Sequence, residues 1–382
     1  YGLYHSRGRS HAAQGKLSFA IADFGQAIAL NPADAASYYH RGLAHFARGD
    51  LEEAITDYTQ AIALLSRDDA STLDRATDLA ASHAMRAEAY RAQGDLQAAL
   101  ADCSEALGHY PDAASAALDR AEAYHHRALV LYQLAEAGAA IADLSQAADL
   151  YPAGPATRHV RAAVHHERAQ AYRDVGNVAA AVEDYTQALS LYPEDHDTAP
   201  VRVALYYDRA TAQRELGDLE AAVADLDETL TLDPNHPSAY HDRGMIRSQQ
   251  GDPAAAVADL GQALSQNSSS AEAFYVRGLS HHRLGDLDAA VADYAEAIRL
   301  DAEYGEALYR RGLAYAALED QAAAVADFSQ AIEHMPQDAE IYYHRAQAQA
   351  ALNAWGPAID DYTEAAVLDP QNATVYHERG LA

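Results

Sequence analysis

The stretch "HRGLAHFARGDLEEAITDYTQAIAL", residues 40–64, places two apolar-periodic segments on either side of Gly49-Asp50. Apolar residues that recur every three or four positions favour an amphipathic helix. A Gly followed by Asp is typical of the end of one helix and the start of the next. Arg41 stands eight residues before Gly49, and Asp57 stands eight residues after it. This stretch therefore predicts two antiparallel helices joined by a tight turn.

The same sixteen-residue spacing from Arg to Asp occurs ten times along the chain. The pairs are Arg7/Asp23, Arg41/Asp57, Arg86/Asp102, Arg127/Asp143, Arg168/Asp184, Arg209/Asp225, Arg243/Asp259, Arg277/Asp293, Arg311/Asp327 and Arg345/Asp361, and Arg379 begins an eleventh. Consecutive arginines are separated by 34, 45, 41, 41, 41, 34, 34, 34, 34 and 34 residues. A fixed period of this kind indicates a repeat array that grows along one axis around a continuous core.

We interpret residues 1–382 as one continuous array of ten complete repeats and the start of another. The repeats are 1–34, 35–68, 80–113, 121–154, 162–195, 203–236, 237–270, 271–304, 305–338 and 339–372, followed by the partial 373–382, with insertions at 69–79, 114–120, 155–161 and 196–202. At 3.6 residues per turn, insertions of seven or eleven residues are near whole helical turns. They are therefore predicted to extend four neighbouring first helices in phase, as a ridge along one edge.

Equivalent positions of the repeats share one residue type. One column is always alanine, from Ala20 and Ala54 to Ala358, and the next column is always Ile, Leu or Val. With its 34-residue period, the chain resembles the tetratricopeptide repeat family over its whole length. It differs from that pattern in having Tyr or His where Trp is usual and Arg where Leu is usual. The resemblance implies an all-α fold, a right-handed α-solenoid or superhelix of antiparallel helix-turn-helix repeats, whose concave face of first helices binds peptides or proteins.

The Arg–Asp pairs are predicted to be structural. Equal distances from the turn place both side chains at the same height, about 12 Å from the turn at 1.5 Å per residue. The guanidinium can then donate two hydrogen bonds to the carboxylate. Because all copies look alike, none is singled out as a catalytic site. The pairs Arg41–Asp57, Arg243–Asp259 and Arg277–Asp293 represent this prediction.

Two sets of side chains are candidates for partner binding. The column that lines the family's concave groove holds Tyr39, Tyr207, Tyr275, Tyr309, Tyr343, His125, His166 and His241. Exposed Tyr supplies large contact area at low entropic cost, although the same rings could simply pack between adjacent helices. The second set is Arg120, Arg161 and Arg202, which share a register on the predicted ridge. These arginines could hold an anionic ligand or could pair with local carboxylates such as Asp119.

The net charge narrows the class of partner. The chain has 27 Lys and Arg against 57 Asp and Glu, a net charge of −30. Binding to nucleic acid or to an anionic membrane surface is disfavoured, because both depend on protein cations. No apolar run approaches the length of about 18 residues that spans a membrane. A protein or peptide, in particular a basic one, is the expected partner, and self-association is a further expectation.

The sequence contains no catalytic, metal or cofactor motif. No His-x3-His pair occurs, and there is no phosphate loop, GxSxG, CxxC or dinucleotide fingerprint. The single cysteine, Cys103, stands where other repeats have Phe24 or Tyr58, which indicates core packing. We therefore expect no enzymatic activity, no cofactor and no metal. Asn267 and Asn372 begin glycosylation sequons, which matter only if the chain is secreted.

These features predict a non-catalytic scaffold that binds a protein or peptide in the concave groove. Two alternatives remain. The array could stack end to end into a filament, because its last repeat is incomplete and uncapped. It could also be the sensor arm of a larger signalling protein. No signal peptide is visible, which favours the cytoplasm. The chain lacks an initiator Met, however, so a secreted or cell-surface location stays open.

Overall fold

The computed structural model of the chain describes residues 1–67, 73–195 and 197–382, and its regular structure is helical. The described residues form two compact units, Tyr1–Leu216 and Gly217–Ala382. The boundary lies at the turn in the middle of the predicted repeat 203–236. Whether the two units form one continuous array stays a prediction.

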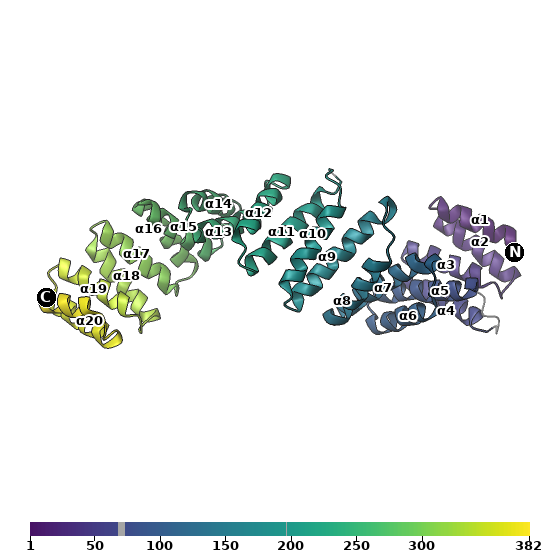
Figure 1. Ribbon diagram of the computed structural model, residues 1–382, viewed down its shortest axis with the longest axis horizontal. Helices are drawn as coiled ribbons and strands as arrows, with labels where there is room; N and C mark the ends of the chain where they lie inside the picture. The colour runs from purple at the N-terminus through teal and green to yellow at the C-terminus, as the bar shows by residue number, and fades with distance from the viewer. Residues whose placement is uncertain (68–72, 196) are drawn as a thin grey trace. The chain divides into compact units, whose positions relative to one another are not determined.

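The first unit contains α1 to α11 and two short 3-10 helices. Their bounds are α1 Gly2–Ala13, α2 Leu17–Leu30, α3 Ala35–Arg48, α4 Leu51–Leu65, α5 Leu73–Gln93, α6 Leu96–His109, η1 Ala114–Ala116, α7 Ala117–Gln133, α8 Ala137–Leu150, η2 Pro155–Thr157, α9 Arg158–Asp174, α10 Val178–Leu191 and α11 Ala199–Glu215. The helices α1, α3, α5, α7 and α9 each pack against the even-numbered helix that follows, each pair packs against the next, and α11 packs against α10 (Figure 1).

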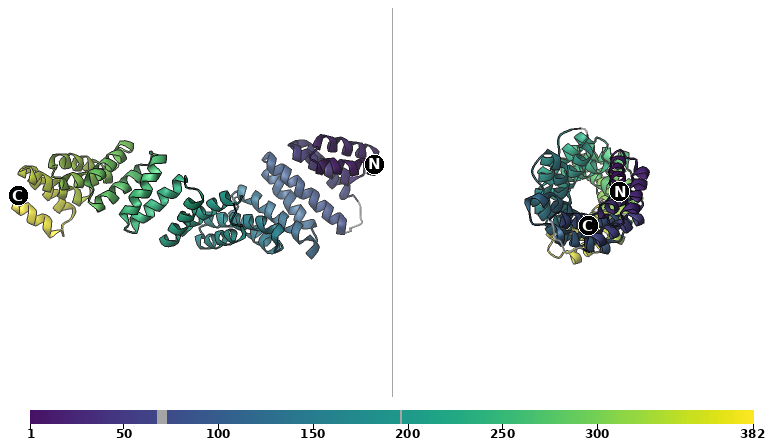
Figure 2. Two further views of the ribbon diagram at one scale, coloured as in Figure 1. Left: turned by 90° about the horizontal axis from the view of Figure 1, so that it is seen from above. Right: turned by 90° about the vertical axis from the view of Figure 1, so that its right-hand side faces the viewer.

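The second unit contains α12 to α21. Their bounds are α12 Leu219–Leu232, α13 Pro237–Gln249, α14 Pro253–Gln266, α15 Ala271–Leu284, α16 Leu287–Leu300, α17 Gly305–Ala317, α18 Gln321–His334, α19 Ala339–Ala351, α20 Trp355–Leu368 and α21 Ala373–Leu381. Successive helix pairs lie side by side in this unit as in the first (Figure 2). Both units are α-solenoids, as the repeat pattern predicts.

The turn inside each repeat has a left-handed residue. Gly49 ends α3 with φ 92°, and its amide and that of Asp50 donate to the last carbonyls of the helix. The same position has positive φ in all ten repeats, seven times as Gly and otherwise as Ala135, Glu319 and Asn353. Glycine reaches this region without the steric cost that a Cβ atom adds. In six repeats the next residue is an Asp that precedes the second helix, and Asp95, for example, accepts from the Ala98 amide.

The core lies between the two helices of each repeat. All ten residues of the alanine column, from Ala20 to Ala358, are completely buried. At Gly42 the approach is so close that a Cβ atom would lie 2.7 Å from the Tyr58 ring. Cys103 is buried in the same column as Tyr58, and burial raises the pKa of its thiol to about 12. It therefore serves as core packing.

The insertions lengthen the first helices by less than the sequence predicts. Within 114–120 and 155–161, only the last four residues belong to α7 and α9, and the first three form η1 and η2. The predicted α-helical extension is thus wrong for 114–116 and 155–157. Tyr110 before Pro111 and Tyr151 before Pro152 are extended, which ends α6 and α8 upstream of these 3-10 helices. Residues 73–79 lie in α5 and residues 199–202 in α11, whereas 69–72 and 196 lie outside the described residues.

Candidate functional site

Each Arg–Asp pair that lies within one unit closes as a two-pronged ion pair, here called a clasp. The arginine Nε and Nη2 atoms donate to the two carboxylate oxygens over 2.5–2.8 Å. The predicted pairs Arg41–Asp57, Arg243–Asp259 and Arg277–Asp293 are among them. All these aspartates are buried. The pair Arg209–Asp225 has one residue in each unit.

In the repeats of Arg86, Arg168, Arg243 and Arg345, the third guanidinium nitrogen links the clasp to the second helix of the preceding repeat. Arg86 Nη1 donates to the Thr59 hydroxyl over 2.9 Å, and Arg345 Nη1 donates to the Ser329 hydroxyl over 3.1 Å. Thr59 and Ser329 stand two residues after the clasp aspartate of their own repeat. One arginine thus joins both helices of its repeat to the second helix of the repeat before it.

An aromatic ring lies over every arginine of these nine clasps, and it comes from one of two positions. In most repeats it is the residue three before the arginine, as in Tyr38 over Arg41 at 5.6 Å. Where that position is His83, His165 or Leu308, the ring comes from four residues after the arginine, as Tyr90, Tyr172 and Tyr315 at 5.9–6.0 Å. Comparing the residue three before the arginine with the residue four after it, across the repeats, would have predicted this alternation from the sequence.

Histidine at the vacated position adds a second donor to the clasp aspartate. His83 Nδ1 lies 2.8 Å from an Asp102 oxygen, and His165 Nδ1 lies 2.8 Å from an Asp184 oxygen. Burial raises the pKa of Asp102, but the hydrogen bonds from Arg86 and His83 outweigh it and lower the pKa overall. The clasp of Asp102 is thus buried, fully bonded and ionised, which suits a structural role.

The candidate groove rings pack on a buried column of the second helices. Ring centroids are 5.9–6.0 Å apart for Tyr39–Tyr58, His166–Tyr185, Tyr275–Tyr294, Tyr309–Phe328 and Tyr343–Tyr362. Tyr39, Tyr207, Tyr275, Tyr343, His166 and His241 are half-buried and keep part of their surface open. Tyr309 is only 7% exposed and His125 only 8%, so the expectation of exposed side chains is wrong for these two.

The two buried residues have partners that explain their burial. The Tyr309 ring contacts the His344 ring at 5.9 Å, and its hydroxyl donates to Glu340 over 3.4 Å. His125 Nε2 lies 2.6 Å from Glu167 in the next repeat. Tyr309 and His125 therefore pack between neighbouring first helices, which is the alternative role that the sequence analysis gave for this column.

The ridge arginines do not share one environment. Arg120 pairs with Asp112, and Arg202 is buried, with Nη2 bonded to the Tyr206 hydroxyl over 3.2 Å and its guanidinium over that ring. Arg161 is half-buried and forms no hydrogen bond or ion pair with the described residues. Local contacts thus occupy Arg120 and Arg202, although Asp119 is not their partner.

A series of polar side-chain contacts joins α7, α9 and α11, which are the first helices of three successive repeats. His125 reaches Glu167, His166 Nε2 lies 3.3 Å from Asp208, and Tyr132 donates to Asp174 over 2.6 Å. Each contact spans 42 residues, one more than the local 41-residue repeat. These side chains belong to the same faces as the groove column, which is therefore polar as well as aromatic in the first unit.

No group of three or more His, Cys, Asp or Glu side chains in the described residues could hold a metal ion. The described helices also include none that is both long and apolar enough to cross a bilayer.

The fold and the clasps define a helical repeat protein built on 34-residue units. The tetratricopeptide repeat models match residues 5–70, 166–237 and 241–305, and also 305–338. This chain belongs to the tetratricopeptide repeat family. No match was found among curated proteins.

Solved structures of the same fold are similar to the chain at low sequence identity. The C-terminal part of a repeat protein from Cytophaga hutchinsonii is 15% identical, with a TM-score of 0.53, and the match covers 65% of this chain and 97% of that one. YrrB, described as a repeat protein with an unusual peptide-binding site, is 22% identical, with a TM-score of 0.47, over 52% of this chain and 99% of that one. A repeat protein from Parabacteroides merdae is 20% identical, with a TM-score of 0.45, over 69% and 98%. These similarities concern the fold.

Proposed function

We propose that this chain is a non-catalytic scaffold that binds a protein or an extended peptide along the faces of its first helices. The observation that carries the proposal is the column of half-buried Tyr and His side chains, which repeats along these helices. Four of these rings, those of Tyr39, His166, Tyr275 and Tyr343, pack on a buried ring of the second helix, as Tyr343 does on Tyr362 at 6.0 Å. A ring held rigid on one side and open on the other loses little entropy when a partner covers it.

The net charge favours a partner that carries cations. The chain has a net charge of −30, and opposite charges steer association and select partners. Lys and Arg side chains also stack favourably on Tyr rings in a negative potential. A basic segment is therefore the proposed ligand.

A displayed random peptide library, panned against the whole chain, tests this proposal. Peptides selected on the wild type should bind the double variant Tyr275→Ala/Tyr343→Ala more weakly by about 2 kcal/mol, the scale of an interface hot spot. Tyr309 is left unchanged, because replacing this buried side chain would also destabilise the fold and obscure the effect on binding. Trp355→Ala is the matched control, since Trp355 is 46% exposed but begins a second helix, α20. Failure to select any peptide, or equal binding by wild type and double variant, would contradict the proposal.

A further inference from the structure

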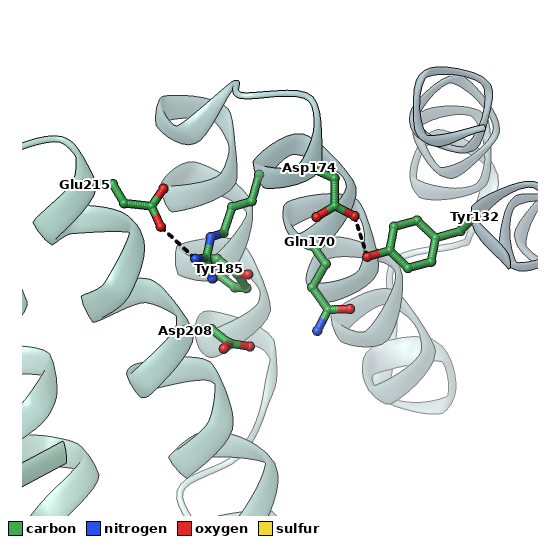
Figure 3. Close-up of a pocket in the computed structure, with 7 residues that line it drawn as sticks. Tyr132, Gln170, Asp174, Tyr185, Asp208 and Glu215 are labelled. Atoms are coloured by element: carbon green, nitrogen blue, oxygen red, sulfur yellow. Dashed lines mark hydrogen bonds and ion pairs between the residues drawn. The ribbon is translucent and has the colours of Figure 1, made fainter. Parts of the chain in front are cut away.

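A polar pocket of about 420 Å³ lies in the first unit, between the first helices α7, α9 and α11 and the second helix α10 (Figure 3). Its lining includes Tyr132 of α7, Arg173 and Asp174 of α9, Tyr185 of α10, and Asp208 and Glu215 of α11. A volume of roughly 300–1,000 Å³ is usual for sites that bind small groups. Among the groove candidates, His166 touches this set through Asp208, Gln170 and the Tyr185 ring, but the sequence reasoning did not find the pocket.

The carboxylates of the pocket outnumber its cation. Asp174, Asp208 and Glu215 face one guanidinium, that of Arg173, which donates to Glu215 over 2.7 Å. Figure 3 shows Asp208 and Glu215 on one side of the space and Asp174 on the other. Each carboxylate uses one oxygen, and its second oxygen has no bond to any described residue. The pocket therefore has an excess of negative charge and several free acceptors.

The floor of the pocket holds a buried hydroxyl without a partner. Tyr185 is completely buried, yet its hydroxyl and the neighbouring Arg173 Nε have no hydrogen-bond partner among the described residues. Buried Tyr hydroxyls normally have one. Burial raises the pKa of Tyr185 to about 12, although the adjoining Arg173 guanidinium acts in the opposite direction, so the hydroxyl stays neutral. A polar group that enters the pocket would complete its bonding.

We propose that this pocket binds the cationic side chain of a lysine or arginine residue of a peptide partner. The ammonium or guanidinium donates to the free oxygens of Asp174, Asp208 and Glu215, and the Tyr185 hydroxyl accepts from it or donates to the adjoining peptide carbonyl. The rings of Tyr132 and Tyr185 add cation–π surfaces. An anion is disfavoured, because it would meet three carboxylates and only one guanidinium. This inference rests on the proposed function, since it supplies a subsite within the same face.

Fluorescence anisotropy with labelled deca-lysine, deca-arginine and deca-glutamate tests the proposal on the whole chain. The wild type should bind the two cationic peptides and not deca-glutamate, and the tighter of the two identifies the preferred side chain. Asp174→Asn/Asp208→Asn should weaken cationic binding about tenfold or more. Glu52→Gln/Glu183→Gln, which removes the same charge from exposed positions, should leave it within about twofold. Equal losses in both double variants would overturn the proposal, because binding would then follow net charge alone.

Two single variants separate this site from general electrostatics and from misfolding. Tyr185→Phe should weaken cationic binding by about threefold or more, whereas Tyr294→Phe should not, although its buried hydroxyl also lacks a partner. Arg173→Gln should strengthen cationic binding, because it removes the competing cation. If the wild type binds deca-glutamate and Arg173→Gln abolishes that binding, the pocket is an anion site and the proposal is wrong.

The two proposals fail in different ways. If library peptides bind the wild type and all pocket variants equally, but not Tyr275→Ala/Tyr343→Ala, the pocket inference alone fails. If no library peptide binds the wild type, the scaffold proposal fails.

Discussion

Removal of a clasp arginine should cost most where the aspartate has no second close donor. Asp293 is 5% exposed and receives both of its short bonds from Arg277, while His281 Nε2 stays 3.8 Å away. Arg277→Ala should therefore destabilise the second unit by about 3 kcal/mol, because a buried carboxylate is left unpaired. Urea unfolding followed by a local probe measures this, since repeat arrays need not unfold in two states.

The clasp of Arg243 supplies the internal comparison. Its partner, Asp259, also accepts from Arg247 Nη1 over 2.8 Å. Arg243→Ala should thus cost clearly less than Arg277→Ala. The double variant Arg277→Met/Asp293→Leu should recover much of the single variant's loss, because apolar pairs often replace buried ion pairs without penalty. Equal losses in all three variants would argue against the clasp.

His40 should make the stability of the first unit depend on pH. Burial, assisted by the positive charges of His5 and Arg9, lowers the pKa of His40 from its usual 6.5 to about 4. Between these two pKa values, His40 is protonated in the unfolded chain but neutral in the folded chain. The stability of the fold should therefore decrease as the pH drops from about 6.5 to about 4. Because the ring is partly exposed, we expect a loss of about 1–2 kcal/mol.

The change in urea midpoint between pH 7 and pH 4.5 measures this effect. Comparing that change between variants cancels the contribution of the other titrating groups. His40→Phe keeps the stacking on Phe24, seen at 5.8 Å, and should flatten the pH dependence. His377→Phe, at an exposed position, is the control and should not. An unchanged slope in His40→Phe would contradict the assignment.

At the level of the helix pair, the left-handed turn position offers the simplest stabilising change. Ala135 and Glu319 have φ values of 62° and 65°, where a Cβ atom is strained. Ala135→Gly should stabilise by about 0.5–1 kcal/mol, and Gly49→Ala should destabilise by a similar or larger amount. Thermal unfolding of both variants checks the prediction, and a loss of stability in Ala135→Gly would show that the turn is not strained.

The first turn of each extended helix should be removable only in whole turns. Deleting 117–120 from α7 removes four residues, about 1.1 turns, and should keep the apolar face aligned. Deleting 117–118 rotates that face by about 200° relative to 114–116 and should disrupt packing. Circular dichroism and melting temperature distinguish the outcomes, and similar melting of both deletions would mean that this segment packs loosely.

The degree to which the sequence predicts each contact depends on how local its geometry is. Arg41 and Asp57 are symmetric about one turn, so their pairing follows from helix geometry alone. The Arg86–Thr59 bond and the pocket around Tyr185 depend on how one repeat sits on the next. Contacts between neighbouring repeats join a residue to the position that follows its own equivalent in the next repeat, as in Tyr132 and Asp174, which are 42 residues apart. The residue types that form these contacts vary from repeat to repeat, so aligning the repeats in the sequence does not predict the contacts.

For the whole molecule, charge should set the salt dependence of partner binding. A net charge of −30 spread over the chain acts on a basic peptide through solvent, and that action is screened over about 10 Å at 0.1 M salt. Contacts to the half-buried Asp208 and to the buried Tyr185 in the pocket are partly desolvated and should be screened less. Raising salt from about 0.05 to 0.5 M should therefore weaken deca-lysine binding to the wild type but leave a residual component. Asp174→Asn/Asp208→Asn should lose that residual component, whereas Glu52→Gln/Glu183→Gln should lower only the salt-sensitive one. Anisotropy titrations at the two salt concentrations separate these terms, and parallel salt slopes with no residual binding in the wild type would assign the interaction to the general field of the protein.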